Sequence, residues 1–115
     1  MKANLVVTGI FISIMLIANE ASAKDSPLEK SRGEIIYSVH CAVCHGIQGK
    51  GDGPSSAVLI PKPQDFTEPE VKSILTKDRM MKSIMDGKPG SQMEGWKEKL
   101  SNEDIEAVVE YIKLL

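Results

Sequence analysis

The clearest hydrophobic pattern in the chain lies near its C-terminus, in LSNEDIEAVVEYI (100–112). Its apolar residues recur three and four positions apart, the spacing that places side chains on one face of an α-helix. They are Ile105, Val108, Val109 and Ile112. Ser101 can cap this helix, and Asp104 three residues later completes a capping-box pattern. The stretch therefore predicts an amphipathic helix that packs its apolar stripe on another element.

A second helical pattern covers about Leu28 to Val43 and leads directly into a pair of cysteines. Its apolar positions at helical spacing are Ile36, Val39 and Val43. Gly33 and Tyr37 lie one turn apart, so bare backbone beside an aromatic ring could let the C-terminal helix cross closely. Gly33 could equally mark a late start of the helix, and the sequence leaves both interpretations open.

The middle of the chain reads as loops and two short helices, with almost no strand signal. Glycines make GIQGKGDGP (46–54) an irregular loop, and two prolines keep LIPKPQDF (59–66) extended. Pro69 opens a helix of two turns with apolar residues at Val71, Ile74 and Leu75. Another helix is expected at Asp78 to Asp86, ended by Gly87 and Pro89. The pattern as a whole predicts an all-α domain.

The first 23 residues have the pattern of a secretory signal peptide. Lys2 precedes an uncharged apolar run from Leu5 to Ile17, and Ala21 and Ala23 flank Ser22 as in a cleavage site. A membrane anchor that is not cleaved is the alternative, but the run is short for a span of ~20 residues. We therefore expect cleavage after Ala23, export to the periplasm, and one mature domain over residues 24–115 without stable membrane insertion.

Composition narrows the function. The chain has 115 residues and a net charge of −2, with acidic and basic residues mixed along it, so no basic stripe suggests a nucleic-acid partner. Beyond residue 23 the aromatic residues are Tyr37, Phe66, Trp96 and Tyr111. A domain of this size with so few large side chains often completes its interior with a cofactor, a metal or disulfides.

The two cysteines of the chain stand in HCAVCHG (40–46), a pattern shared by redox dithiols, zinc sites and haem-attachment sites. A redox pair belongs at the start of a helix, where the dipole lowers the thiol pKa, whereas this pair ends one. Zinc would need both neighbouring histidines, which crowds four ligands into six residues. Haem fits: Cys41 and Cys44 can each add to a vinyl group of one porphyrin, and His45 can bind the iron.

A methionine is the better candidate for the opposite side of the iron, because His40 is tied to the same helix end as the attachment point. Met80, Met81 and Met85 lie at helical spacing and are expected to fill the core. Met93 lies in GSQMEGW (90–96), a loop from which its thioether could reach over the ring, and we predict that it is the second ligand.

Five motifs in order along the chain resemble a small monohaem class I cytochrome c. They are Gly33 with Tyr37, CAVCHG (41–46), GKGDGP (49–54), Met93 with Trp96, and the helix of residues 100–112. The resemblance implies about four short helices wrapped round one covalently bound haem c, with the first and last helices crossing. It also implies His45 and Met93 as iron ligands.

The same resemblance implies a role for the proline segment and exposes one departure. The carbonyl of Pro61, or as a second choice Pro63, is expected to accept a hydrogen bond from the other ring nitrogen of His45, which would orient that ligand. Many relatives have proline directly after the ligand methionine, where this chain has Glu94. Trp96 is then expected to be the main packing anchor of the loop that carries Met93 (90–96) and to lie at the haem.

Two protein ligands would leave the iron no open position, so one-electron transfer rather than enzymatic turnover is expected. The leading hypothesis is a monomeric carrier that meets redox partner proteins briefly through an exposed haem edge. The alternatives are a haem subunit of a larger oxidoreductase, and a sensor in which Met93 dissociates to admit a small ligand.

Overall fold

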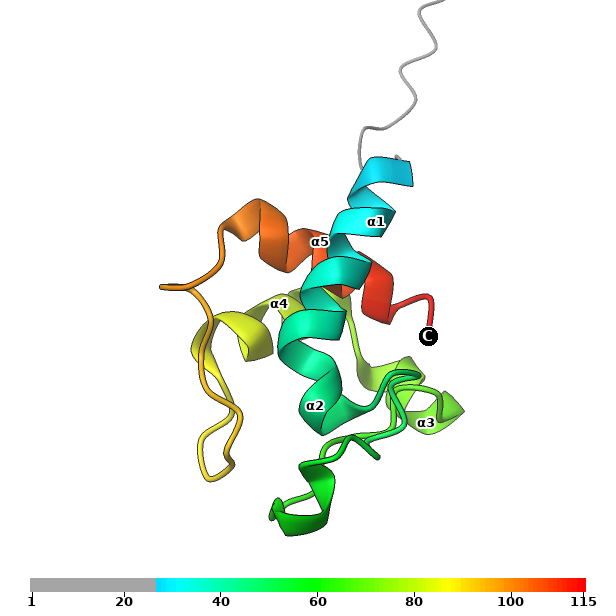
Figure 1. Cartoon of the computed structure of the whole chain (residues 1–115), viewed down its shortest axis with the longest axis vertical. Helices are drawn as coiled ribbons and strands as arrows, with labels where there is room; N and C mark the ends of the chain where they lie inside the picture. The colour runs from blue at the N-terminus through cyan, green and yellow to red at the C-terminus, as the bar shows by residue number, and fades with distance from the viewer. Residues whose placement is uncertain (1–26) are drawn as a thin grey trace, which may run out of the picture.

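The computed structural model describes residues 27–115, which form helices joined by loops with no strand among them (Figure 1). The elements in chain order are α1 (Pro27–Ile36), the π-helical turn η2 (Tyr37–Cys41), α2 (Ala42–His45), the 3₁₀ turn η3 (Ser56–Val58), α3 (Pro69–Ile74), α4 (Lys77–Asp86) and α5 (Asn102–Ile112). The all-α class is confirmed. The predicted signal peptide (1–23) and the start of the mature domain at residue 24 lie outside the described residues. Within 27–115, every helix is too short or too polar to cross a bilayer.

The first and last helices cross closely, with Gly33 at the crossing point (Figure 1). A Cβ atom at Gly33 would collide with the Ala107 carbonyl oxygen and lie 3.0 Å from the Cβ of Tyr111. The rings of Tyr37 and Tyr111 meet with their centroids 5.3 Å apart. Gly33 lies inside α1 rather than at its start, so of the two interpretations of this glycine the close crossing is correct.

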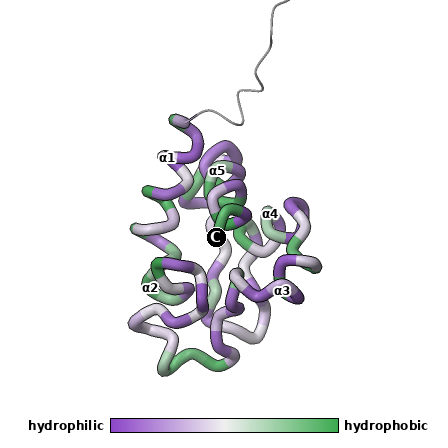
Figure 2. The backbone as a smooth tube through the Cα atoms, turned by 90° about the vertical axis from the view of Figure 1, so that its right-hand side faces the viewer, coloured by the Kyte–Doolittle hydropathy of each residue, from purple (hydrophilic) through white to green (hydrophobic). Residues whose placement is uncertain are grey.

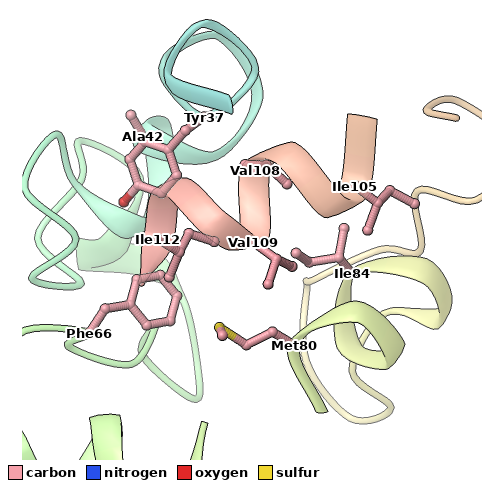
Figure 3. Close-up of a cluster of buried hydrophobic side chains, with 9 residues drawn as sticks. All are labelled: Tyr37, Ala42, Phe66, Met80, Ile84, Ile105, Val108, Val109 and Ile112. Atoms are coloured by element: carbon pink, nitrogen blue, oxygen red, sulfur yellow. The ribbon is translucent and has the colours of Figure 1, made fainter. Parts of the chain in front are cut away.

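The apolar stripe of α5 forms the centre of the core, as its spacing predicts. Ile105, Val108 and Val109 are 0% exposed, and Ile112 is 7% exposed (Figure 3). α1, η2 and α2 follow one another without a break over residues 27–45, and we name them the first helical rod. Around the stripe of α5 pack Tyr37 and Ala42 from this rod, Phe66, and Met80 and Ile84 from α4. The predicted cap is present, because the backbone N–H of Asp104 donates to the Ser101 hydroxyl over 3.1 Å.

The two helices of the middle region form where proline and capping residues allow them. Pro69 takes the first position of α3, and the Thr76 hydroxyl accepts a hydrogen bond of 3.3 Å from the N–H of Arg79 at the start of α4. Gly87, with φ of 75°, ends α4. α4 then lies beside α5, where Lys77 forms an ion pair with Glu106.

The face of the first helical rod that packs in the core is not the face on which the valines recur at helical spacing. Val39 and Val43 are 65% and 48% exposed, whereas Tyr37 and Ala42 are buried. Figure 2 accordingly shows hydrophobic stretches on α1 and α2 as well as on α5. The helix forms as predicted, but its contact face is set by Gly33, where backbone can approach backbone. The π turn fits this arrangement, since it lets residues five apart, Tyr37 and Ala42, face the same core.

Candidate functional site

The CAVCHG motif (41–46) lies at the C-terminal end of the first helical rod. Cys41 closes the π turn, Cys44 lies in α2, and His45 is the last helical residue. Both cysteines are free thiols and half-buried. Burial and, after it, the nearby Cys44 raise the pKa of Cys41 to about 11. Cys41 is therefore a protonated thiol at neutral pH, unlike the thiolate of a redox-active dithiol.

The imidazole of His45 is half-buried. Its ring stacks on Phe66, with centroids 4.9 Å apart and planes 15° from parallel. Burial lowers the pKa of His45, which favours the neutral ring that a metal requires. Its Nδ1 atom is buried and has no hydrogen-bond partner among the described residues. A buried nitrogen left unpaired is costly. The predicted bond to a proline carbonyl would satisfy Nδ1 and would leave Nε2 as the nitrogen that could bind a metal.

The glycine-rich loop after His45 caps the helix end through its backbone. Every second residue of the loop donates its N–H to a carbonyl at the helix end. As the donors advance along the loop, their acceptors move back along the helix, one residue at a time. The N–H groups of Gly49, Gly51, Gly53 and Ser55 donate to the carbonyls of Gly46, His45, Cys44 and Val43, over 3.0, 2.8, 3.2 and 2.9 Å. We name these four bonds the carbonyl ladder. The loop that its composition predicted to be irregular is therefore regular in its pairing.

Side chains cannot replace the hydrogens at the glycines of this ladder. A Cβ at Gly53 would collide with the carbonyls of Ala42 and Val43, and one at Gly51 with the carbonyl of Pro63. Gly46 and Gly51 also have φ values of 83° and 70°, a region that favours glycine. The alternation of glycine in GKGDG thus follows from the close approach of two backbones.

The proline segment lies against the carbonyl ladder, through Pro63 on Gly51. Pro63 is half-buried and Pro61 is exposed. Neither carbonyl accepts a hydrogen bond from Nδ1 of His45 in this structure. The bond to Pro61, or to Pro63, stays a prediction.

The loop of residues 90–96, which was predicted to supply the second iron ligand, is hydrogen-bonded to the C-terminal end of α4. The N–H of Trp96 donates to the carbonyl of Ile84 over 2.8 Å, and the N–H of Lys88 donates to the carbonyl of Met93 over 3.0 Å. Met93 is half-buried and packs against the edge of the core, whereas Met80 is 5% exposed inside it (Figure 3). Met80 therefore fills the core as predicted, and the assignment of Met93 as an iron ligand stays a prediction.

Trp96 connects this loop to the helix that carries the cysteines. Its ring lies 5.0 Å from that of His40, centroid to centroid, and the ammonium group of Lys99 lies 5.1 Å from the Trp96 centroid. His40 is exposed and was considered from the sequence only as a possible metal ligand, so its contact with Trp96 was not predicted. Two features of the sequence could have indicated this contact: His40 directly precedes Cys41, and Trp96 follows Met93 by three residues.

These features together define a haem-attachment site on an all-helical fold. Two free thiols three residues apart can form thioethers with the two vinyl groups of one porphyrin, and the half-buried imidazole next to them, whose lowered pKa favours the neutral form, can bind its iron. The residues present therefore fit haem c.

The comparisons with known proteins assign the family. The family model for cytochrome c matches residues 31–115, and the chain belongs to that family. Its cofactor is accordingly covalently bound haem c, attached through Cys41 and Cys44. No curated protein matches the chain significantly.

Solved structures of c-type cytochromes share the fold. A protein in the "Kuenenia stuttgartiensis reducing HAO-like protein complex Kustc0457/Kustc0458" is 26% identical, with a TM-score of 0.67 over 76% of this chain. The chain spans 43% of that protein's length. The "KustC0563 c-type cytochrome" is 28% identical, with a TM-score of 0.56 over 70% of this chain and 93% of its own. The "c-type cytochrome NirC", at 18% identity and a TM-score of 0.56, covers 77% of this chain and 93% of its own and shares the fold.

Proposed function

We propose that this cytochrome c is an exported one-electron carrier whose haem iron is bound by His45 and Met93. The haem supplies a one-electron couple; the protein holds the ring, excludes water from it and fixes the ligands. A soft thioether opposite an imidazole favours the reduced iron, so a comparatively high reduction potential is expected. With both axial positions filled, the protein transfers electrons without converting a substrate.

The observation that carries the proposal is the state of the CAVCHG motif at the helix end. Its two thiols are free, and the half-buried His45 has a lowered pKa, which favours the neutral ring that can bind a metal. Met93 lies in a loop whose ends are hydrogen-bonded to each other or to α4. That anchoring supports Met93 as the ligand, because a fixed loop can present its thioether in nearly one position in both oxidation states.

A haemochrome spectrum and a mass measurement test the attachment together. In alkaline pyridine the exported protein should give the spectrum of a haem with both vinyl groups saturated. Its mass should exceed that of the polypeptide by one haem, and neither cysteine should react with an alkylating reagent. A mass equal to the polypeptide alone, with both thiols reactive, would refute the proposal.

We also propose that residues 1–23 are a signal peptide and that the mature protein acts in the periplasm. Cleavage after Ala23 predicts Lys24 as the first residue of the protein recovered from the periplasm. A protein that begins at Met1 and sediments with the membrane fraction would instead support the anchor.

A second candidate is a haem subunit of a larger oxidoreductase. It is favoured by the similarity to a protein whose structure was solved in an HAO-like protein complex. The two candidates differ in size under native conditions. A free carrier elutes as a monomer from the exported fraction, whereas a subunit co-purifies with a catalytic chain at a constant ratio.

A further inference from the structure

The carbonyl ladder has a fifth donor, which comes from the core. The Tyr37 hydroxyl donates to the Gly46 carbonyl over 2.6 Å. The same carbonyl accepts the N–H of Gly49 over 3.0 Å, so both of its lone pairs are used. Tyr37 is 1% exposed, and its ring is held against Tyr111 at the crossing of α1 and α5.

This hydrogen bond connects the rigid part of the fold with the haem motif. Tyr37 lies two turns before the end of its own helical rod, and Gly46 is the residue directly after His45. Burial is the main reason that the pKa of Tyr37 is raised, so its hydroxyl keeps its proton and remains a donor. The position of Gly46, and with it the last turn of the helix, is therefore fixed from the core.

We infer that Tyr37 is a positioning residue for the haem ligand: through the Gly46 carbonyl and the carbonyl ladder it holds His45 in one place and adjusts the reduction potential. This inference rests on the proposed function, because it requires an iron bound by His45. The bond is buried, and a buried hydrogen bond between well-packed groups has no water to replace it when the donor is removed.

The physical effect on the iron follows from the dipole of the Gly46 carbonyl. With the Tyr37 hydroxyl present, the negative end of this dipole is compensated. Without it, the oxygen keeps only the bond from Gly49, and one of its lone pairs is left uncompensated, one residue from the iron ligand and in a region of low dielectric constant. A negative end close to the iron favours the oxidised, more positively charged state. Loss of the hydroxyl should therefore lower the reduction potential.

Tyr37→Phe tests the inference, and Tyr111→Phe is its matched control. The control removes a hydroxyl from the other ring of the same pair and leaves the bond to Gly46 in place. In the haem-bearing exported protein, Tyr37→Phe should lower the reduction potential in a spectroelectrochemical titration. It should also make the backbone amides of Gly49, Gly51 and Gly53 exchange about fivefold faster, the loss expected for one buried hydrogen bond. Tyr111→Phe should keep the wild-type values of both.

Two results would overturn the inference. One is an unchanged potential and unchanged exchange in haem-bearing Tyr37→Phe. The other is a lower melting temperature with an unchanged potential, which describes a merely structural role. A wild-type chain without the haemochrome spectrum would instead overturn the proposed function, so the two failures are distinguishable.

A second pair of variants serves if Tyr37→Phe does not fold. Gly51→Ala forces a methyl group onto the Pro63 carbonyl and disturbs the ladder bond to His45. Its control is Ile35→Ala, at a side chain of α1 that is 61% exposed and lies outside both the ladder and the loop of residues 90–96. A changed potential in Gly51→Ala, with Ile35→Ala at the wild-type value, supports a ladder that positions His45. Equal potentials in both variants overturn it.

Discussion

Gly33→Ala should destabilise the protein through the crossing of α1 and α5. The new methyl group would collide with the Ala107 carbonyl oxygen, and it would lie 2.8 Å from the Ala107 carbonyl carbon and 3.0 Å from the Cβ of Tyr111. These atoms belong to or sit close to a helix backbone, so they cannot rotate away and the two helices must separate. Overpacking of this kind costs up to ~3 kcal/mol. Alanine recovers ~1 kcal/mol through its higher helix propensity, which leaves a net loss of ~2 kcal/mol.

Thermal unfolding of the haem-bearing protein, followed by circular dichroism, measures this loss. A destabilisation of ~2 kcal/mol lowers the melting temperature of a domain of this size by roughly 8–16 °C. The control is Glu34→Ala, one residue further along the same helix and exposed, which should change stability by less than ~0.5 kcal/mol. If Gly33→Ala melts at or above the wild-type temperature, the helices do not depend on bare backbone at the crossing.

Three further outcomes are expected. Ile105→Ala, in the core, should cost ~2–5 kcal/mol in guanidinium unfolding, whereas Ile35→Ala, at a side chain 61% exposed, should cost under ~0.5 kcal/mol; equal losses would contradict the described core. Met93→Ala should abolish the methionine-to-iron charge-transfer band while haem stays attached. If the band is lost instead on replacing Met81 or Met85, the half-buried methionines of α4, then the ligand is one of those two. Alanine at both Cys41 and Cys44 should leave the exported chain haem-free and largely unfolded, because its own core is small; a cooperative melt of that variant would argue against a structural role for the haem.

The elements that were predicted correctly are those whose signals are local. α5 carries its cap and its stripe within twelve residues, so spacing alone identifies both the helix and its buried face. α4 is similar, with Gly87 at its end. In each case the residues that form the element also determine which side is buried, and no distant partner is needed.

The first helical rod shows where local pattern is insufficient. Its valines at 39 and 43 have the right spacing for a core face, yet the face that packs contains Gly33 and Tyr37. The face with Gly33 packs against α5 because a glycine lets two helix backbones approach more closely than a valine does. The shape of the facing surface on α5 is set by residues about seventy positions later, which a local pattern does not include.

The carbonyl ladder was missed for a different reason. Glycines were taken as a sign of irregular backbone, which is their usual meaning in a loop. Here they alternate at positions 49, 51 and 53, and each of them donates its N–H to a carbonyl at the end of the helix. Their partner carbonyls lie only three to twelve residues earlier, so the signal was present in the sequence. It lay in the spacing of the glycines and not in their number.

Side-chain packing stabilises the region around α5, whereas backbone hydrogen bonds stabilise the segment from Gly46 to Glu68. This difference bears on the role of the cofactor. Around α5 the core consists of aliphatic side chains in contact. Between Gly46 and Glu68, all within the described part of the chain, Phe66 is the only large apolar side chain that is buried, and the order of that segment comes mainly from backbone hydrogen bonds. Each such bond contributes only ~1 kcal/mol net in water, and more where water is excluded. A haem attached beside His45 and Phe66 would exclude that water, so the group that carries the electron also strengthens the bonds that position its own ligand.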